Sequence, residues 1–162
     1  MSVFQKPLAT TRSATGIPTG RLAVWWVLAS EIVIFGGLLA TYLMHRLGHP
    51  EWANAAAVTN TWIGAFNTLV LLSSSFTAVL AHQAATEGNG PKAARLLGFT
   101  MLGGCTFIVV KALEWTHEIS EGFTITSNTF WSFYYTAAGL HALHVIAGVV
   151  IMGIVAADAR RN

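Results

Sequence analysis

Three ionisable side chains, Glu31, His141 and His144, fall inside otherwise apolar segments of the sequence. Glu31 lies ten residues beyond Arg21, about 15 Å along a helix axis, which predicts a depth similar to that of the two histidines. His141 and His144 are three residues apart and share one helix face. Ionisable groups at such depth are costly, so they are paired, protonated or facing a water-filled path.

Two histidines and one carboxylate could handle protons, form a metal triad, or make a hydrogen bond that only fixes helix packing. A di-iron site would need further carboxylates projecting inward, and only Glu31 is available at this depth. We therefore predict no metal ligands in this chain. Packing and proton support both remain open for Glu31, His141 and His144.

Lys111 and Glu114 form a second candidate, near the end of the third apolar segment. Their spacing allows an ion pair on one helix face, and the lysine stem can reach along an apolar surface. The pair could simply anchor the outer end of the helix, or it could contribute to a proton exit or a partner contact.

The composition excludes an ordinary soluble domain. Of the 162 residues, 54% are hydrophobic and only 10% are charged, against roughly a quarter charged in soluble domains. The net charge is only +2, which argues against a nucleic-acid partner. The single cysteine, Cys105, rules out an intrachain disulfide and a cysteine-based metal site.

Four apolar segments, at residues 22–44, 62–81, 94–113 and 130–157, are each long enough to cross a bilayer. Polar connections containing Gly48, Pro50, Gly88, Asn89 and Pro91 separate the first three. We predict an all-α integral membrane protein with a four-helix transmembrane bundle over residues 21–157. A polar cytoplasmic segment at residues 1–20 and a cytoplasmic tail at 158–162 flank it.

The basic residues predict the orientation of these helices, because short cytoplasmic loops keep an excess of lysine and arginine. In a four-pass arrangement most of them fall on one side, which places both termini in the cytoplasm. These residues are Lys6, Arg12, Arg21, Lys92, Arg95, Arg160 and Arg161.

Small residues predict where the helices approach closely, since membrane helices associate through van der Waals packing of such positions. The candidates for helix packing are Gly36, Gly37, Gly103, Gly104 and Gly148. No glycine-rich phosphate loop, Ser–His–Asp set or haem-attachment motif is present, and no second histidine faces His141 as a haem anchor would require. The pattern is typical of an accessory membrane subunit.

Ordered motifs over residues 21–153 resemble subunit III of the haem–copper oxidases, the cytochrome c oxidase type, together with its relatives that accompany nitric oxide reductase. The motifs are, in chain order, Ala29-Ser30-Glu31, Phe35-Gly36-Gly37, Asn67-Thr68-Leu69, Leu71-Leu72-Ser73-Ser74, Lys111, Glu114-Trp115, Ser127-Asn128 and Gly139-Leu140-His141-Ala142-Leu143-His144-Val145-Ile146-Ala147-Gly148.

The resemblance implies a non-catalytic subunit of a proton-translocating oxidase in a bacterial plasma membrane. Such a subunit holds no cofactor itself, packs against the catalytic subunit I that holds haem and copper, binds phospholipid, and supports proton uptake and durability. Other oxidase subunits, and a larger respiratory supercomplex, would be further partners. In the family, Glu31 matches a buried glutamate, and His141 and His144 match paired histidines.

The sequence also departs from the family pattern. Members usually have seven helices, or five in short forms, and the last family helix has no counterpart after residue 157. Lys111 stands where many mitochondrial-type members have glutamine, which favours bacterial branches. Two alternatives stay open: an accessory subunit of nitric oxide reductase, and an independent membrane protein that binds haem or quinone.

Overall fold

The computed structural model describes residues 19–159, and every regular element in that range is helical. The chain divides into two compact units, Met1–Trp52 and Ala53–Asn162. Four helices are long and apolar enough to cross a membrane, which confirms the predicted all-α fold with four spans. Most of the predicted segment 1–20, and residues 160–162 of the predicted tail, lie outside the described range, so those boundaries stay predictions.

The first unit contains helix α1 (Thr19–Gly48). At about 1.5 Å per residue, its 30 residues exceed the length that a bilayer core of about 30 Å requires. The hydroxyls of Ser30 and Thr41 donate to carbonyl oxygens of their own helix, at 2.7 and 2.8 Å. These polar groups are therefore satisfied without a partner helix.

A short helix, α2 (Trp52–Val58), lies in the region that the sequence predicts as a polar connection. Its interior is Ala53-Asn54-Ala55-Ala56-Ala57, and alanine has the highest helix propensity. At seven residues it is too short to show an apolar period, which explains why the sequence analysis did not find it.

Polar caps define helices α3 (Thr61–Thr86) and α4 (Gly90–Ser120). The Asn60 side chain accepts hydrogen bonds from the backbone N–H groups of Trp62 and Ile63, at 3.0 and 3.3 Å, as an N-cap residue does. Between the helices Gly88 adopts φ +76°, a left-handed conformation that glycine tolerates. Asn89 then caps α4 by accepting from the N–H of Lys92 at 3.1 Å.

Helix α5 (Thr129–Ala159) follows a loop that is held by its own side chains. The Ser127 hydroxyl donates to the Gly122 carbonyl at 3.0 Å and accepts from the Thr124 N–H at 2.7 Å. The Asn128 side chain accepts from the N–H of Trp131 at 3.0 Å. These bonds fix the point at which α5 begins.

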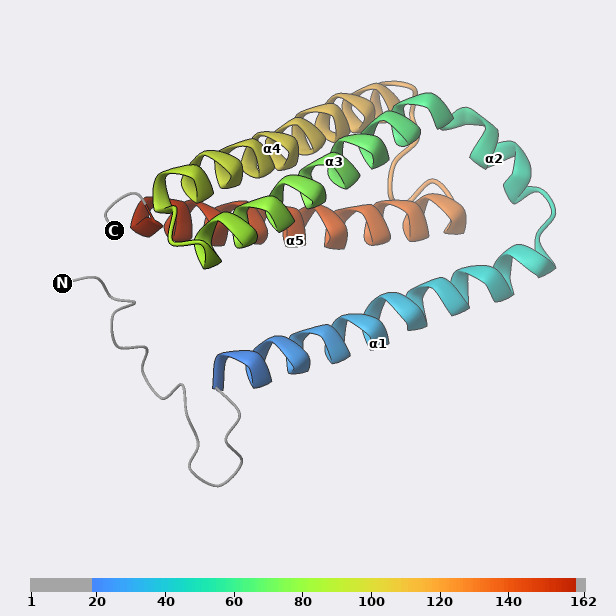
Figure 1. The fold of residues 1–162 in the computed structure, drawn as a ribbon. Coiled ribbons are helices and arrows are strands. Elements are labelled where there is room, and N and C mark those ends of the chain that lie inside the picture. The colour runs from blue at the N-terminus through green and yellow to red at the C-terminus, as the bar shows by residue number, and fades with distance from the viewer. Residues whose placement is uncertain (1–18, 160–162) are drawn as a thin grey trace. The chain divides into compact units, whose positions relative to one another are not determined.

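In the second unit α4 packs against both α3 and α5, and consecutive helices run in opposite directions (Figure 1). A Cβ at Gly103 would lie 2.7 Å from Ser74 Cβ on α3, and one at Gly104 would lie 2.6 Å from a Val149 methyl on α5. Of these two adjacent glycines, Gly103 therefore faces α3 and Gly104 faces α5. Near Gly103 the hydroxyls of Thr77 and Thr100 lie 2.8 Å apart and join α3 to α4.

An aromatic core stabilises the end of the unit where α5 begins. Trp131 is completely buried, and its ring stacks on Phe123 with centroids 4.9 Å apart. Tyr135 lies beside it, and its hydroxyl donates to the Phe123 carbonyl at 2.8 Å. Aromatic pairs of this kind contribute about 0.5–1.5 kcal/mol beyond their buried area.

Candidate functional site

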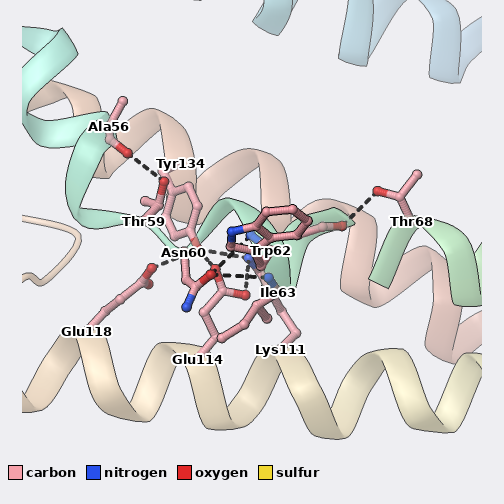
Figure 2. Close-up of polar contacts among 11 residues, drawn as sticks. Ala56, Thr59, Asn60, Trp62, Ile63, Thr68, Lys111, Glu114, Glu118 and Tyr134 are labelled. Carbon is pink, nitrogen blue, oxygen red and sulfur yellow. Dashed lines mark hydrogen bonds and ion pairs between the residues drawn. The ribbon is translucent and has the colours of Figure 1, made fainter. Parts of the chain in front are cut away.

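A polar cluster joins α4 to α5, and we name it the Lys111 cluster: Lys111, Glu114 and Glu118 on α4, with Tyr134 on α5 (Figure 2). Lys111 Nζ lies 3.0 Å from Glu114 Oε2 and 2.8 Å from the Tyr134 hydroxyl. That hydroxyl lies 2.8 Å from Glu114 Oε1 and 3.0 Å from Glu118 Oε1. Three α4 side chains thus meet at the phenolic oxygen of Tyr134.

Helix geometry brings the three α4 residues together, because positions three and four apart share a face. Glu114 and Glu118 are only 8% and 4% exposed, and the Lys111 side chain is 14% exposed. Buried charges of this kind need partners. The lysine satisfies Glu114 directly, and its ammonium also lies 4.6 Å from the centre of the Tyr134 ring, a cation–π distance.

The second oxygen of Glu118 differs from the rest of the cluster. Glu118 Oε2 is buried and has no hydrogen-bond partner among residues 19–159. Burying an unpaired anionic oxygen is much more costly than burying a neutral one. The ionisation state of Glu118 is therefore the main chemical question that this site raises.

Two pockets meet at Glu114. One, of about 340 Å³, also reaches Asn60, His117, Glu118 and Glu121 near the end of α4. The other, of about 380 Å³, also reaches Asn67, Lys111 and His141. The cluster therefore lies between a pocket beside the middle of α4 and one at the end of α4.

The pocket beside the middle of α4 contains His141, a candidate from the sequence, and Asn67. His141 lines it and packs edge-on against Phe107, with ring centroids 5.2 Å apart. Asn67 is 4% exposed, and its Oδ1 has no hydrogen-bond partner in the described part of the chain. The His144 Nδ1 donates to the Leu140 carbonyl of the same helix at 2.6 Å.

Glu31 lies near the middle of α1, in the first unit, whereas His141 and His144 belong to the second. A contact between Glu31 and the histidines stays a prediction. Gly36 and Gly37 also lie on α1, and their packing role is likewise a prediction. Gly148 on α5 has no neighbour within 4 Å of an added Cβ in the described structure.

No group of three or more His, Cys, Asp or Glu residues within positions 19–159 could hold a metal ion. The Lys111 cluster offers two carboxylates, but the Tyr134 hydroxyl lies between them. The Lys111 ammonium contacts Glu114 and that hydroxyl, and it cannot ligate a cation while protonated. The side chains of the cluster can donate and accept protons.

Sequence analysis identified Lys111 and Glu114 but missed Glu118 and Tyr134. Glu118 had a visible signal, since it stands four residues after Glu114 and shares its face. Tyr134 had none, because which face of the uniformly apolar α5 turns toward α4 depends on packing.

The four long apolar helices and the polar contacts that join α3, α4 and α5 define a multi-pass α-helical membrane protein. A family model described as cytochrome c oxidase subunit III matches residues 9–161. The chain belongs to that family.

Curated relatives agree with this assignment. Cytochrome c oxidase subunit 3 of Corynebacterium diphtheriae is 34% identical over 79% of this chain and 64% of its own length. The subunit of the same name in Bacillus subtilis is 36% identical over 80% and 63%. Cytochrome bo(3) ubiquinol oxidase subunit 3 of Pseudomonas aeruginosa is 34% identical over 83% and 64%. The chain thus spans less than two thirds of the length of these relatives.

Proposed function

We propose that this chain is the redox-centre-free subunit III of a bacterial aerobic terminal oxidase. It packs against the catalytic subunit, which holds haem and copper, and helps to assemble and stabilise it. The observation that carries the proposal is the family match over nearly the whole chain, residues 9–161. The curated relatives named as oxidase subunits support it.

The exposed surface of the helices supports a role within a larger complex. Large apolar side chains cover them, and many are more than 60% exposed: Trp25, Trp26, Ile32, Val33, Leu69, Leu72 and Leu143. Such surface requires lipid or other membrane helices as neighbours. We propose that subunit I covers part of it and that bound phospholipid covers another part.

Glu31, His141 and His144 are proposed to support proton uptake or helix packing within that complex. An ionisable group at mid-membrane depth marks a functional position more often than a neutral one does. Glu31→Gln should reduce the number of turnovers before inactivation, or the yield of assembled oxidase, and leave the haem content per complex unchanged. Loss of haem from the assembled complex would contradict this role.

The decisive experiment is purification of the tagged chain in mild detergent, with mass-spectrometric identification of its partners and optical spectra of chain and complex. We expect a catalytic oxidase subunit to co-purify and the separated chain to be colourless. Because the relatives include subunits of both cytochrome c and ubiquinol oxidases, oxygen consumption should be assayed with both donors. Recovery of a nitric oxide reductase subunit instead, or haem absorbance in the chain alone, would overturn the proposal.

A further inference from the structure

The hydroxyl of Tyr134 has more close neighbours than it can satisfy with one hydrogen. A phenolic hydroxyl donates one hydrogen bond and accepts up to two. Its three neighbours are Lys111 Nζ at 2.8 Å, Glu114 Oε1 at 2.8 Å and Glu118 Oε1 at 3.0 Å. The lysine is a donor only, so it occupies one acceptor position of the hydroxyl.

The two carboxyl oxygens must share what remains, which is one hydrogen and one acceptor position. If both carboxyls were ionised, both would need the same hydrogen, and two buried anions would face a single cation. If one carboxyl is a neutral acid, it donates to the hydroxyl, and the hydroxyl donates to the other carboxylate. Every short contact in the cluster then has one donor and one acceptor.

The surroundings of the two carboxyls decide which one is the acid. Glu114 accepts a charge-assisted hydrogen bond from Lys111 at 3.0 Å through its second oxygen, which favours its ionised form. The second oxygen of Glu118 has no partner in the described part of the chain, and Glu118 is 4% exposed. A neutral carbonyl oxygen can be left unpaired in that position at far lower cost than an anionic one.

We propose that the Lys111 cluster is a binding site for one exchangeable proton, which resides on Glu118 at neutral pH and is shared with Tyr134. One lysine cation then balances one Glu114 anion, so the buried cluster is electrically neutral. This inference does not depend on the proposed function, because it follows from contacts within α4 and α5.

The proton has a route to exchange. Glu114 and Glu118 both line the pocket of about 340 Å³ that also reaches His117 and Glu121, whose side chains are 73% and 46% exposed. The other titratable groups around the cluster are Tyr135 and His141. The Tyr135 hydroxyl donates its hydrogen to the Phe123 carbonyl and interacts electrostatically with Glu118, and His141 lines the pocket on the other side of Glu114.

Infrared difference spectroscopy of the full chain in detergent at pH 7 tests the proposal. Subtracting the Glu118→Gln spectrum from that of the wild type should reveal the carbonyl stretch of a carboxylic acid, which shifts to lower frequency in D2O. Glu121→Gln is the matched control on the same helix and should retain this band. A difference spectrum with carboxylate bands and no acid band would overturn the proposal.

Changing the charge of the cluster provides a second test. If the cluster only held the helices together, the acid band would not respond to these changes. In Glu114→Gln the lysine keeps its charge and Glu118 is the remaining anion, so the acid band should disappear by ionisation of Glu118. In the double variant Lys111→Met with Glu114→Gln the cation is gone, and the acid band should return. An acid band that persists in Glu114→Gln would refute the shared-proton arrangement.

Carbon-13 NMR of the wild-type chain with labelled glutamate assigns the proton without any substitution. The assigned carboxyl carbon of Glu118 should resonate at the position of an acid, and that of Glu114 at the position of a carboxylate. The reverse assignment, or two carboxylate positions, would overturn the proposal even if the variants failed to fold.

Discussion

Gly103→Ala should separate α3 from α4 and destabilise the second unit. The added Cβ would lie 2.7 Å from Ser74 Cβ, an atom bonded directly to the α3 backbone that no side-chain rotation can move away. Carbon atoms in favourable contact lie at least about 3.5 Å apart, so the helices must move apart locally by about 0.8 Å.

That displacement affects a neighbouring contact. The Thr77 and Thr100 hydroxyls, which lie one turn away from Ser74 and Gly103 respectively, are 2.8 Å apart, and a shift of about 0.8 Å would take them beyond hydrogen-bonding distance. Overpacking in a well-packed core typically costs about 1–3 kcal/mol. Replacing glycine with alanine within a helix offsets up to about 1 kcal/mol of this loss.

Gly98→Ala is the matched control on the same helix, because nothing lies within 4 Å of a Cβ at Gly98 in the described structure. Both variants gain the same helix propensity, so the difference between them isolates the packing cost. We expect Gly103→Ala to be less stable than Gly98→Ala by about 1–3 kcal/mol. The assay is unfolding in mixed micelles with increasing SDS, followed by circular dichroism. Equal stabilities would refute the inferred close approach of α3 and α4.

Three further predictions concern packing and orientation. Thr100→Val should lower the free energy of unfolding by about 0.6 kcal/mol relative to Thr106→Val, because among residues 19–159 the Thr106 hydroxyl bonds only to its own helix; equal losses would contradict an interhelical bond. Trp131→Ala should cost about 3–5 kcal/mol, whereas Trp62→Ala, at an 85% exposed position, should cost far less in the same unfolding assay. A green fluorescent protein fused to the C-terminus should fluoresce in bacteria, because the excess of basic residues predicts a cytoplasmic end; activity of alkaline phosphatase fused there would contradict it.

The four long helices could be predicted because a bilayer-spanning helix needs only a sufficiently long apolar segment. Their ends were less predictable. The third segment was expected at residues 94–113, but α4 extends over Gly90–Ser120. Polar residues at both ends continue the helix, since hydropathy marks the apolar part of a helix and not its hydrogen-bonded limits. Turn signals were more precise, because Gly88 and Asn89 separate α3 from α4 and Pro91 lies in the first turn of α4.

Only two of the four residues of the Lys111 cluster, Lys111 and Glu114, were predicted from the sequence. The Lys111 and Glu114 pairing depends on spacing within one helix, which the sequence contains directly. The approach of Tyr134 depends on the rotation of α5 about its own axis, and a helix that is apolar all round carries no such information. Glu31 and the two histidines show the same limit. Their similar depth in the membrane suggests proximity, but it does not determine whether their side chains point toward one another.

The glycine pair on α4 has a consequence for how the chain assembles. Gly103 faces α3 and Gly104 faces α5, and the principal helix contacts all join consecutive helices. Within the second unit, α4 can therefore dock on α3 and α5 on α4 as each is inserted, without waiting for a later segment. A chain interrupted after α4 should already contain a paired α3–α4 hairpin, and α5 would add to this hairpin as the last step of insertion.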